Sequence, residues 1–338
     1  MNKYSRIGIF GLKSDNSLEQ FYLDAFQKLK FKNIKFLSNN FLFKIFCILN
    51  KYKLFFFLKI FYFFQKKKIE NFLNKNDIEI LFIFKGIELN SSIFNIFREK
   101  KINLINIYTD DPFNFSSSAT SSINVINNIR NFNLFCIWSK NLKNKLENKF
   151  KTKNFYYLPF GFSKKKHKAL SNKIIRKKIS FVGSFDEFRL NILSQLKNRI
   201  DIYGNAWPTN IKHQISKFVK NQKFSTIINK SEISLNILKK QNLNSHNMRT
   251  FEIPAMNGLM LTTRSKEQNK YFPENKACYM YGNIKELNYK INFILNNPKA
   301  ALKVRKTGYK LSKKHSYENR LKILINYINK NAKVFNFR

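Results

Sequence analysis

The stretch Asn247-Met-Arg-Thr-Phe-Glu-Ile-Pro-Ala-Met-Asn-Gly-Leu-Met-Leu-Thr262 reads as a short helix followed by an apolar strand, the repeating unit of an α/β fold. Arg249 and Glu252 stand three residues apart at the expected start of this helix, and Gly258 is expected to end it. A guanidinium can bind a diphosphate through two nitrogens, and a carboxylate can accept hydrogen bonds from sugar or ribose hydroxyls. We also expect free backbone N–H groups at the helix start to favour an anion. This pairing suits a nucleotide-sugar donor. The alternative is an ordinary ion pair on the surface of an αβ unit.

Strand and helix patterns alternate along the rest of the chain, which predicts parallel sheets covered by helices. The expected strands are Ile7–Phe10, Ile34–Leu37, Ile78–Phe84, Ile102–Tyr108, Leu134–Trp138, Phe155–Leu158, Ile179–Ser184, Ile200–Tyr203, Ile233–Ile237, Leu259–Thr262 and Ala277–Tyr281. The expected helices are Leu18–Lys30, much of Phe41–Asn74, Ser91–Lys100, Lys140–Lys149, Phe188–Lys197, Phe218–Asn229, Met248–Met256, Ile284–Asn296, Lys299–Lys313 and Tyr317–Asn331.

A polar segment divides this alternation into two halves. Residues 163–178 are dominated by Lys, His and Asn and lack periodic apolar residues, so we interpret them as a linker. The expected domains are therefore residues 1–162 and 179–313, with residues 314–338 forming a terminal segment. Two Rossmann-like halves of this kind would face each other across a cleft lined by the carboxyl ends of both sheets.

The charge of the chain is strongly positive. Lys and Arg number 63 against 20 Asp and Glu, giving a net charge of +43, and 52 of the basic residues are Lys. A charge of this size favours nucleic acid or an anionic membrane as a partner. The abundance of Lys, Asn, Ile and Phe is also what an A/T-rich genome produces at weakly constrained positions. The basic residues are spread throughout and no nucleic-acid-binding motif is present, so we expect no nucleic-acid partner.

The cysteines and apolar segments predict a cytoplasmic protein. Cys47, Cys136 and Cys278 are odd in number and lack metal-ligand spacing, which is typical of reduced thiols in a core. Residues 1–6 lead directly into a strand rather than a secretory signal. Lysines interrupt the most apolar segment, Phe41–Gln65, well short of the ~18 uncharged residues of a spanning helix.

With both halves laid out, the chain resembles the CgeB-like (spore-maturation protein-like) glycosyltransferases, which have the two-Rossmann GT-B architecture. The resemblance spans about residues 78 to 325. The matching stretches are Tyr108-Thr-Asp-Asp-Pro-Phe113, Leu158-Pro-Phe-Gly161, Phe181-Val-Gly-Ser184 with Arg189, Ile202-Tyr-Gly204 with Trp207, Ser234-Leu-Asn236, Asn247–Thr262, and His315-Ser-Tyr317 with Asn319-Arg320.

The resemblance implies transfer of a sugar from a nucleotide-sugar to a cell-surface glycan, glycolipid or protein. It places the donor in the second domain and the acceptor in the first, and it implies that the terminal helix returns to the first domain. Retaining relatives bind the donor through a Glu-x7-Glu pair whose second Glu matches Glu252 and contacts the ribose. The first position holds Asn244, which departs from the pattern because an amide offers no carboxylate. Asn247 completes the implied donor loop.

Asp110 and Asp111 follow an expected strand and precede Pro112, which places them on a loop at the cleft edge of the first domain. A carboxylate there could serve as the general base that an inverting transferase needs. Asp before Pro is equally a routine turn former. No bound metal is expected, because GT-B enzymes generally neutralise the departing diphosphate with Arg, Lys and helix dipoles.

Further donor-binding candidates follow strand ends of the second domain. Gly183 and Ser184 could let a phosphate approach the backbone, and Arg189 could reach the same phosphates or face solvent as an ordinary helix residue. Tyr203 and Gly204, with Trp207 beyond them, could offer aromatic surface for the base, although Trp207 could instead be core.

The Phe41–Lys68 segment mixes large aromatics and leucines with regularly spaced lysines. This composition suits a basic amphipathic surface lying peripherally against anionic lipid on the inner face of the cell membrane. A pair of core helices is the alternative. The rival functions are a GT-B epimerase or hydrolase with the same donor site, and a basic nucleic-acid- or membrane-surface-binding protein without catalysis.

Overall fold

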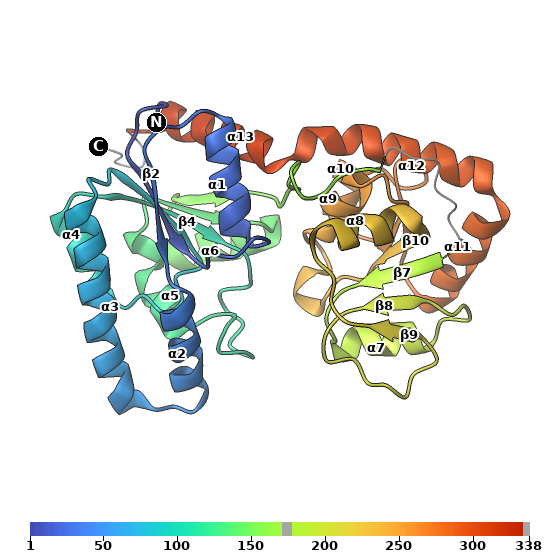
Figure 1. Ribbon diagram of the computed structural model, residues 1–338, viewed down its shortest axis with the longest axis horizontal. Helices are drawn as coiled ribbons and strands as arrows, with labels where there is room; N and C mark the ends of the chain where they lie inside the picture. The colour runs from blue at the N-terminus through green and yellow to red at the C-terminus, as the bar shows by residue number, and fades with distance from the viewer. Residues whose placement is uncertain (171–177, 334–338) are drawn as a thin grey trace. The chain divides into compact units, whose positions relative to one another are not determined.

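The computed structural model describes residues 1–170 and 178–333 and divides into two compact α/β units, which Figure 1 shows with labelled elements. Unit 1 comprises Met1–Pro159 and the chain from Arg320 onward, and unit 2 comprises Phe160–Asn319. Of the expected linker, residues 163–170 lie in unit 2, and residues 171–177 lie outside the described residues.

Unit 1 is built on a six-stranded, wholly parallel sheet with the order β2-β1-β3-β4-β5-β6. Every residue of β1, β3, β4 and β5 is buried, as parallel strands covered on both faces require. The strands are β1 Ile7–Gly11, β2 Ile34–Ser38, β3 Ile80–Phe84, β4 Asn103–Tyr108, β5 Leu134–Ile137 and β6 Phe155–Tyr157.

The helices of unit 1 are α1 Leu18–Lys28, α2 Asn40–Lys51, α3 Phe55–Lys75, α4 Ser91–Glu99, α5 Ile123–Asn128, α6 Lys140–Phe150 and most of α13 Tyr317–Lys330. The long helical segment expected after residue 41 is broken into α2 and α3 by a turn in which Lys53 has a φ of 54°. Within unit 1, the ring of Tyr327 on α13 lies 4.2 Å from that of Tyr156, and Asn329 bonds the backbone of Met1.

Unit 2 contains a second six-stranded parallel sheet, with the order β12-β11-β10-β7-β8-β9. Its strands are β7 Lys178–Val182, β8 Asp201–Tyr203, β9 Gln214–Ser216, β10 Ser231–Asn236, β11 Met260–Thr263 and β12 Tyr279–Tyr281. Its helices are α7 Glu187–Ser194, α8 Asn221–Lys230, α9 Arg249–Ala255, α10 Lys266–Tyr271, α11 Ile284–Asn296 and α12 Pro298–Ser312.

The expected α/β class with two Rossmann-like sheets is confirmed. The expected strands are all present, with ends that differ by a few residues, whereas β9, α5 and α10 were not expected. These three elements are short, and β9 is an edge strand whose residues are all at least partly exposed. None of them carries enough apolar residues to show a period in the sequence.

Candidate functional site

The strand order of unit 2 locates a ligand crevice. The chain moves from β7 to β8 and β9 on one side of the sheet, and from β10 to β11 and β12 on the other. The direction of winding therefore reverses between β7 and β10, and ligands of open parallel sheets bind outside the carboxyl ends of the strands at such a point. β7 ends at Val182 and β10 ends at Asn236, so the crevice should lie beyond these two residues.

Arg249 lies at the carboxyl end of β7. Its Nε donates to the carbonyl of Val182 at 3.2 Å, and its Nη1 donates to the carboxylate of Glu252. The guanidinium carbon is 4.3 Å from the ring centre of Phe224, so the group lies over an aromatic face. Its Nη2 has no partner among the residues that the structure describes, and the side chain is 22% exposed. Arg249 thus presents a fixed, partly accessible cation at the crevice.

Glu252 lies behind Arg249 instead of facing an open cleft. Its side chain is only 2% exposed, and its carboxylate lies between Arg249 and His167, whose Nε2 is 3.5 Å from Oε1. The backbone N–H of Ser163 donates to Nδ1 of His167, which leaves Nε2 as the protonated nitrogen of the neutral ring. Burial lowers the pKa of His167, in keeping with a neutral imidazole. Glu252 is a candidate site residue from the sequence, whereas the sequence analysis did not identify His167.

Several N–H groups at the start of α9, which we expected to be free, have partners within the local turns. The N–H of Thr250 donates to the carbonyl of Asn247, and those of Phe251 and Glu252 donate to Met248. Asn247 and Thr250 also cap each other, since each side-chain oxygen accepts the other's backbone N–H. Local turns therefore satisfy the N–H groups of Asn247, Thr250, Phe251 and Glu252, which removes these four from the expected backbone anion site.

Arg189 connects the two strands at the switch point. Its Nε donates to the carbonyl of Ile237 after β10, and its Nη1 donates to the carbonyl of Ser184 after β7. The side chain is buried instead of facing solvent, and burial lowers the pKa of Arg189 to about 10. The charge of Asp186 opposes this lowering, and the charge of Arg249 adds a smaller one. Two guanidinium groups therefore act on each other at one edge of the sheet, each beside a carboxylate, Asp186 or Glu252.

The glycines after β7 and β8 allow two loops to approach closely. A Cβ on Gly204 would lie 2.0 Å from the carbonyl oxygen of Gly183, so any other residue would push the loops apart. Trp207 is buried and donates its indole N–H to that same carbonyl at 2.8 Å, so it belongs to the core. Tyr203 is partly buried at the end of β8, and Ser184 is exposed.

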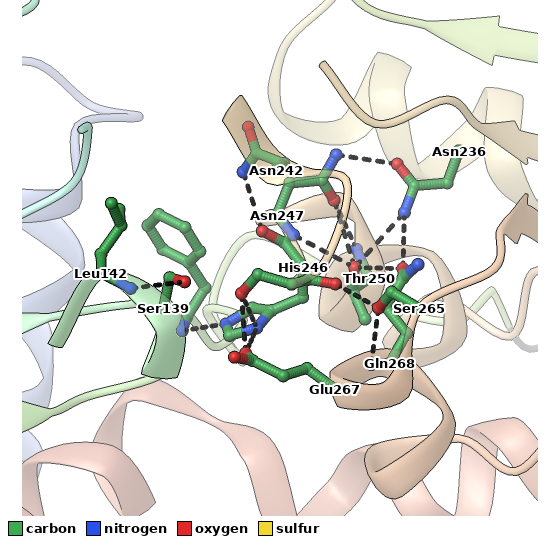
Figure 2. A network of polar contacts seen from close by, with 12 residues as sticks. Ser139, Leu142, Asn236, Asn242, His246, Asn247, Thr250, Ser265, Glu267 and Gln268 are labelled. Carbon is green, nitrogen blue, oxygen red and sulfur yellow. Dashed lines mark hydrogen bonds and ion pairs between the residues drawn. The ribbon is translucent and has the colours of Figure 1, made fainter. Parts of the chain in front are cut away.

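A buried polar network holds the loop that leads into α9, residues 242–248 (Figure 2). The side-chain oxygen of Gln268 accepts hydrogen bonds from Asn236, Thr250 and Thr262, and its nitrogen donates to the carbonyl of Thr263. Asn247 joins by donating to the side chain of Asn236 at 2.9 Å. These side chains come from β10, β11, α10 and the start of α9, so the network fixes the loop against the sheet.

His246 anchors the same loop to another part of unit 2. Its Nε2 accepts the backbone N–H of Phe160 at 3.2 Å, so Nδ1 carries the proton towards the carboxylate of Glu267, 3.0 Å away (Figure 2). His246 is fully buried, which supports a structural role. Asn244 is exposed two residues earlier, at the position where the resemblance implies a sugar-binding carboxylate.

The two carboxylates proposed for unit 1 differ in their surroundings. Asp110 forms an ion pair with Lys85 at 2.6 Å, and both side chains are partly exposed beyond the carboxyl ends of β3 and β4. Asp111 accepts the backbone N–H of Phe113 at 2.9 Å, which is the turn-forming arrangement. Asp110 is therefore the better placed of the two for contact with a substrate.

Glu88 is a buried carboxylate at the same edge that the sequence did not reveal. It is 2% exposed, accepts a hydrogen bond from Asn39, and has no partner for Oε2 among the described residues. Burial raises the pKa of Glu88 to about 7, and the nearby Glu19 adds to this rise. Only its position four residues after a predicted strand could have drawn attention to it.

Comparison with known proteins agrees with this architecture. A family model described as glycosyl transferase-like matches residues 187–326, a range that includes Arg189, Arg249 and Glu252. Residues 187–326 are thus similar to a glycosyl transferase-like domain, and the chain has the GT-B fold. A search of curated proteins finds no significant match.

Several solved structures share the fold at low sequence identity. Sucrose-phosphate synthase (tll1590) from Thermosynechococcus elongatus is similar with a TM-score of 0.68 and 9% identity, covering 97% of this chain and 100% of that one. Anabaena Alr3699/HepE, solved in complex with UDP, has a TM-score of 0.62 and 8% identity over 96% and 100% of the two chains. TarM from S. aureus has a TM-score of 0.58 and 16% identity over 74% of this chain and 54% of its own, so this chain spans about half the length of TarM.

Proposed function

We propose that this protein transfers a sugar from a nucleotide-sugar donor to a cell-surface glycan, glycolipid or protein, as a member of the CgeB-like glycosyltransferases. One observation carries the proposal: Arg249 is fixed at the switch point of unit 2, its Nη2 has no partner among the described residues, and its charge acts on the guanidinium of Arg189. A nucleoside diphosphate would add an anion that both guanidinium groups can bind, beyond the carboxylates of Glu252 and Asp186 that already act on them. The UDP complex of the similar Anabaena structure supports this choice of ligand.

In the proposed donor complex, Arg249 binds the diphosphate and Glu252 keeps the guanidinium in place. The carboxylate already contacts Arg249 and His167, so it acts as a positioning group here. The direct ribose contact that the family resemblance implies would require one of these contacts to loosen. We propose no metal ion, because the two arginines provide the positive charge.

On the acceptor side, Asp110 is the proposed general base. It would take the proton from the acceptor hydroxyl as that oxygen bonds to the anomeric carbon and the bond to the diphosphate breaks, releasing a nucleoside diphosphate. Lys85, 2.6 Å from Asp110, would orient the carboxylate. We further propose that the protein works in the cytoplasm, peripherally on the inner face of the membrane.

Ligand-induced thermal shifts test the donor site. UDP, other nucleoside diphosphates and nucleotide-sugars should raise the melting temperature, since a hundredfold excess over the Kd stabilises by roughly 2.7 kcal/mol. Arg249→Lys should raise the apparent Kd obtained from these shifts by at least tenfold, because an ammonium group cannot bind a phosphate through two nitrogens as the planar guanidinium does.

Arg199→Lys is the matched control, because Arg199 is exposed just before β8, at the amino end of that strand. No shift with any nucleotide, or equal loss in both variants, would remove the proposal. Release of free sugar with no transfer to any acceptor would instead indicate a hydrolase.

A further inference from the structure

Unit 1 exposes an unusual concentration of large apolar side chains on the α2–α3 hairpin, Asn40–Lys75. Phe41 and Phe56 are 71% and 70% exposed. The other exposed members are Ile48, Tyr52, Leu54, Phe55, Phe57, Ile60, Phe63 and Phe64. Single exposed apolar residues are ordinary, but a contiguous group of this size marks an interaction surface.

The hairpin has its own internal packing, so this exposure does not come from loose helices. Phe46 on α2 and Phe61 on α3 are buried, with ring centres 5.8 Å apart. Between the two helices lies a hollow of about 490 Å³ lined almost entirely by apolar side chains, among them Leu42, Ile45 and Phe57. The helices are thus paired along an inner seam and present their remaining apolar residues outward.

The charge of the hairpin is entirely positive over its apolar length. No Asp or Glu occurs between Asp24 and Glu70. Lysines lie among the exposed aromatics at positions 44, 51, 53, 59, 66, 67 and 68. A surface that combines large exposed apolar side chains with long cationic ones matches the interface of an anionic bilayer. There, lysines contact the head groups and aromatic rings enter the boundary of the acyl chains.

The hairpin adjoins the edge of the sheet where the acceptor is proposed to bind. α2 starts two residues after β2 ends, so the hairpin leaves the sheet from its carboxyl edge (Figure 1). The thiol of Cys47 on α2 lies 3.6 Å from the carbonyl of Ser118, and the hydroxyl of Tyr62 on α3 accepts from Asn124 at 3.0 Å. The segment that contains Ser118 begins at Asp110 and ends at α5, so a bilayer against the hairpin lies beside this loop.

We propose that the α2–α3 hairpin docks unit 1 reversibly on an anionic bilayer, and that the acceptor of the transfer is carried by a membrane lipid. The first part stands on the surface itself, and the second rests on the proposed function. A second copy of the chain is a poorer occupant, because it would bring two sets of seven lysines together. Within residues 1–170 and 178–333, no helix has both the length and the apolarity to cross a bilayer.

Vesicle flotation with the full chain tests the proposal. Binding to vesicles that contain phosphatidylglycerol should exceed binding to pure phosphatidylcholine by at least tenfold, and 1 M salt should release the protein because the screening length falls to roughly 3 Å. Lys51→Gln/Lys53→Gln/Lys59→Gln should reduce the partition coefficient on the order of a hundredfold, at about fivefold per lysine. The control Lys303→Gln/Lys306→Gln/Lys310→Gln removes the same charge from exposed positions on α12 and should bind like the natural chain.

A second pair of variants tests the apolar part. Phe55→Ser/Phe56→Ser should lower anionic binding at least tenfold, because both rings would leave the acyl boundary. Tyr289→Ser removes an aromatic of similar exposure, 62%, from unit 2 and should have no effect. Equal recovery with both lipids, recovery with neither, or equal loss in hairpin and control variants would overturn the docking proposal. So would concentration-dependent dimerisation that disappears in Phe55→Ser/Phe56→Ser, since a second copy would then be the occupant.

The UDP thermal shift, measured without vesicles, separates this proposal from the donor site. Hairpin variants should keep the shift of the natural chain. Vesicle binding without any nucleotide shift would leave docking intact and remove the proposed function. A nucleotide shift without vesicle binding would leave the proposed function intact and remove the docking proposal. Transfer to a free glycan at the same rate as to a lipid-linked one would refute the lipid-borne acceptor.

Discussion

The substitution Glu88→Gln should raise the free energy of unfolding of unit 1 above that of the natural chain, and this difference should be larger at pH 8 than at pH 5. Burial raises the pKa of Glu88 from 4.5 to about 7, so the folded carboxyl keeps its proton over a range in which the unfolded one has lost it. The folded state therefore loses stability from this group as pH rises from 4.5 through 7, and the loss is complete above that. The change in pKa corresponds to roughly 3 kcal/mol. Gln retains the acceptor for Asn39 but cannot ionise.

Urea unfolding at pH 5 and pH 8 measures this difference, with hydrogen exchange of β3 peptides used to observe unit 1 by itself. The difference in free energy of unfolding between Glu88→Gln and the natural chain should increase by roughly 2 to 3 kcal/mol, in favour of the variant, from pH 5 to pH 8. Glu99→Gln, at an exposed position on α4, is the control and should change nothing. Parallel pH profiles for Glu88→Gln and the natural chain would mean that Glu88 does not keep its proton in the folded state.

Three further substitutions address the site. Glu252→Ala should lower the free energy of unfolding of unit 2 by about 3 kcal/mol, because it leaves Arg249 without its buried partner, whereas Glu252→Gln should lower it less. Equal melting temperatures for Glu252→Ala and the natural chain would contradict this. Asp110→Asn should reduce kcat on the order of a hundredfold or more. Asp111→Asn keeps the oxygen that accepts in the turn and should retain most activity. The reverse order in turnover assays would exclude Asp110 as the base. Gly204→Ala should destabilise by about 1–3 kcal/mol in urea unfolding, since its Cβ meets a backbone carbonyl. Gly282→Ala, whose Cβ meets only the side-chain ends of Arg264 and Glu286, should not.

Part of the site follows from the sequence. The apolar run before Gly183, the position of α9, and the proximity of Arg249 and Glu252 on its first turn are local features that residue type and spacing predict. The roles within this pair do not follow. Glu252 is enclosed because His167, far away in the chain, packs against it, and Arg189 is buried because two strand ends accept its hydrogen bonds. The same Asp-Asp pair of unit 1 divides into one ion-paired and one turn-forming carboxylate only through Lys85 and Phe113.

The α/β alternation can be predicted from the sequence, because the period of apolar residues is a local property and strands such as β3 consist entirely of buried side chains. The sequence also determines the charge and aromatic content of the α2–α3 hairpin. The tertiary structure alone decided that these aromatics face outward, that the edge strand β9 forms against β8, and that Glu88 lies in a site that favours its proton. Each of these depends on contacts between residues far apart in the chain, and local residue patterns do not encode which distant segments will meet.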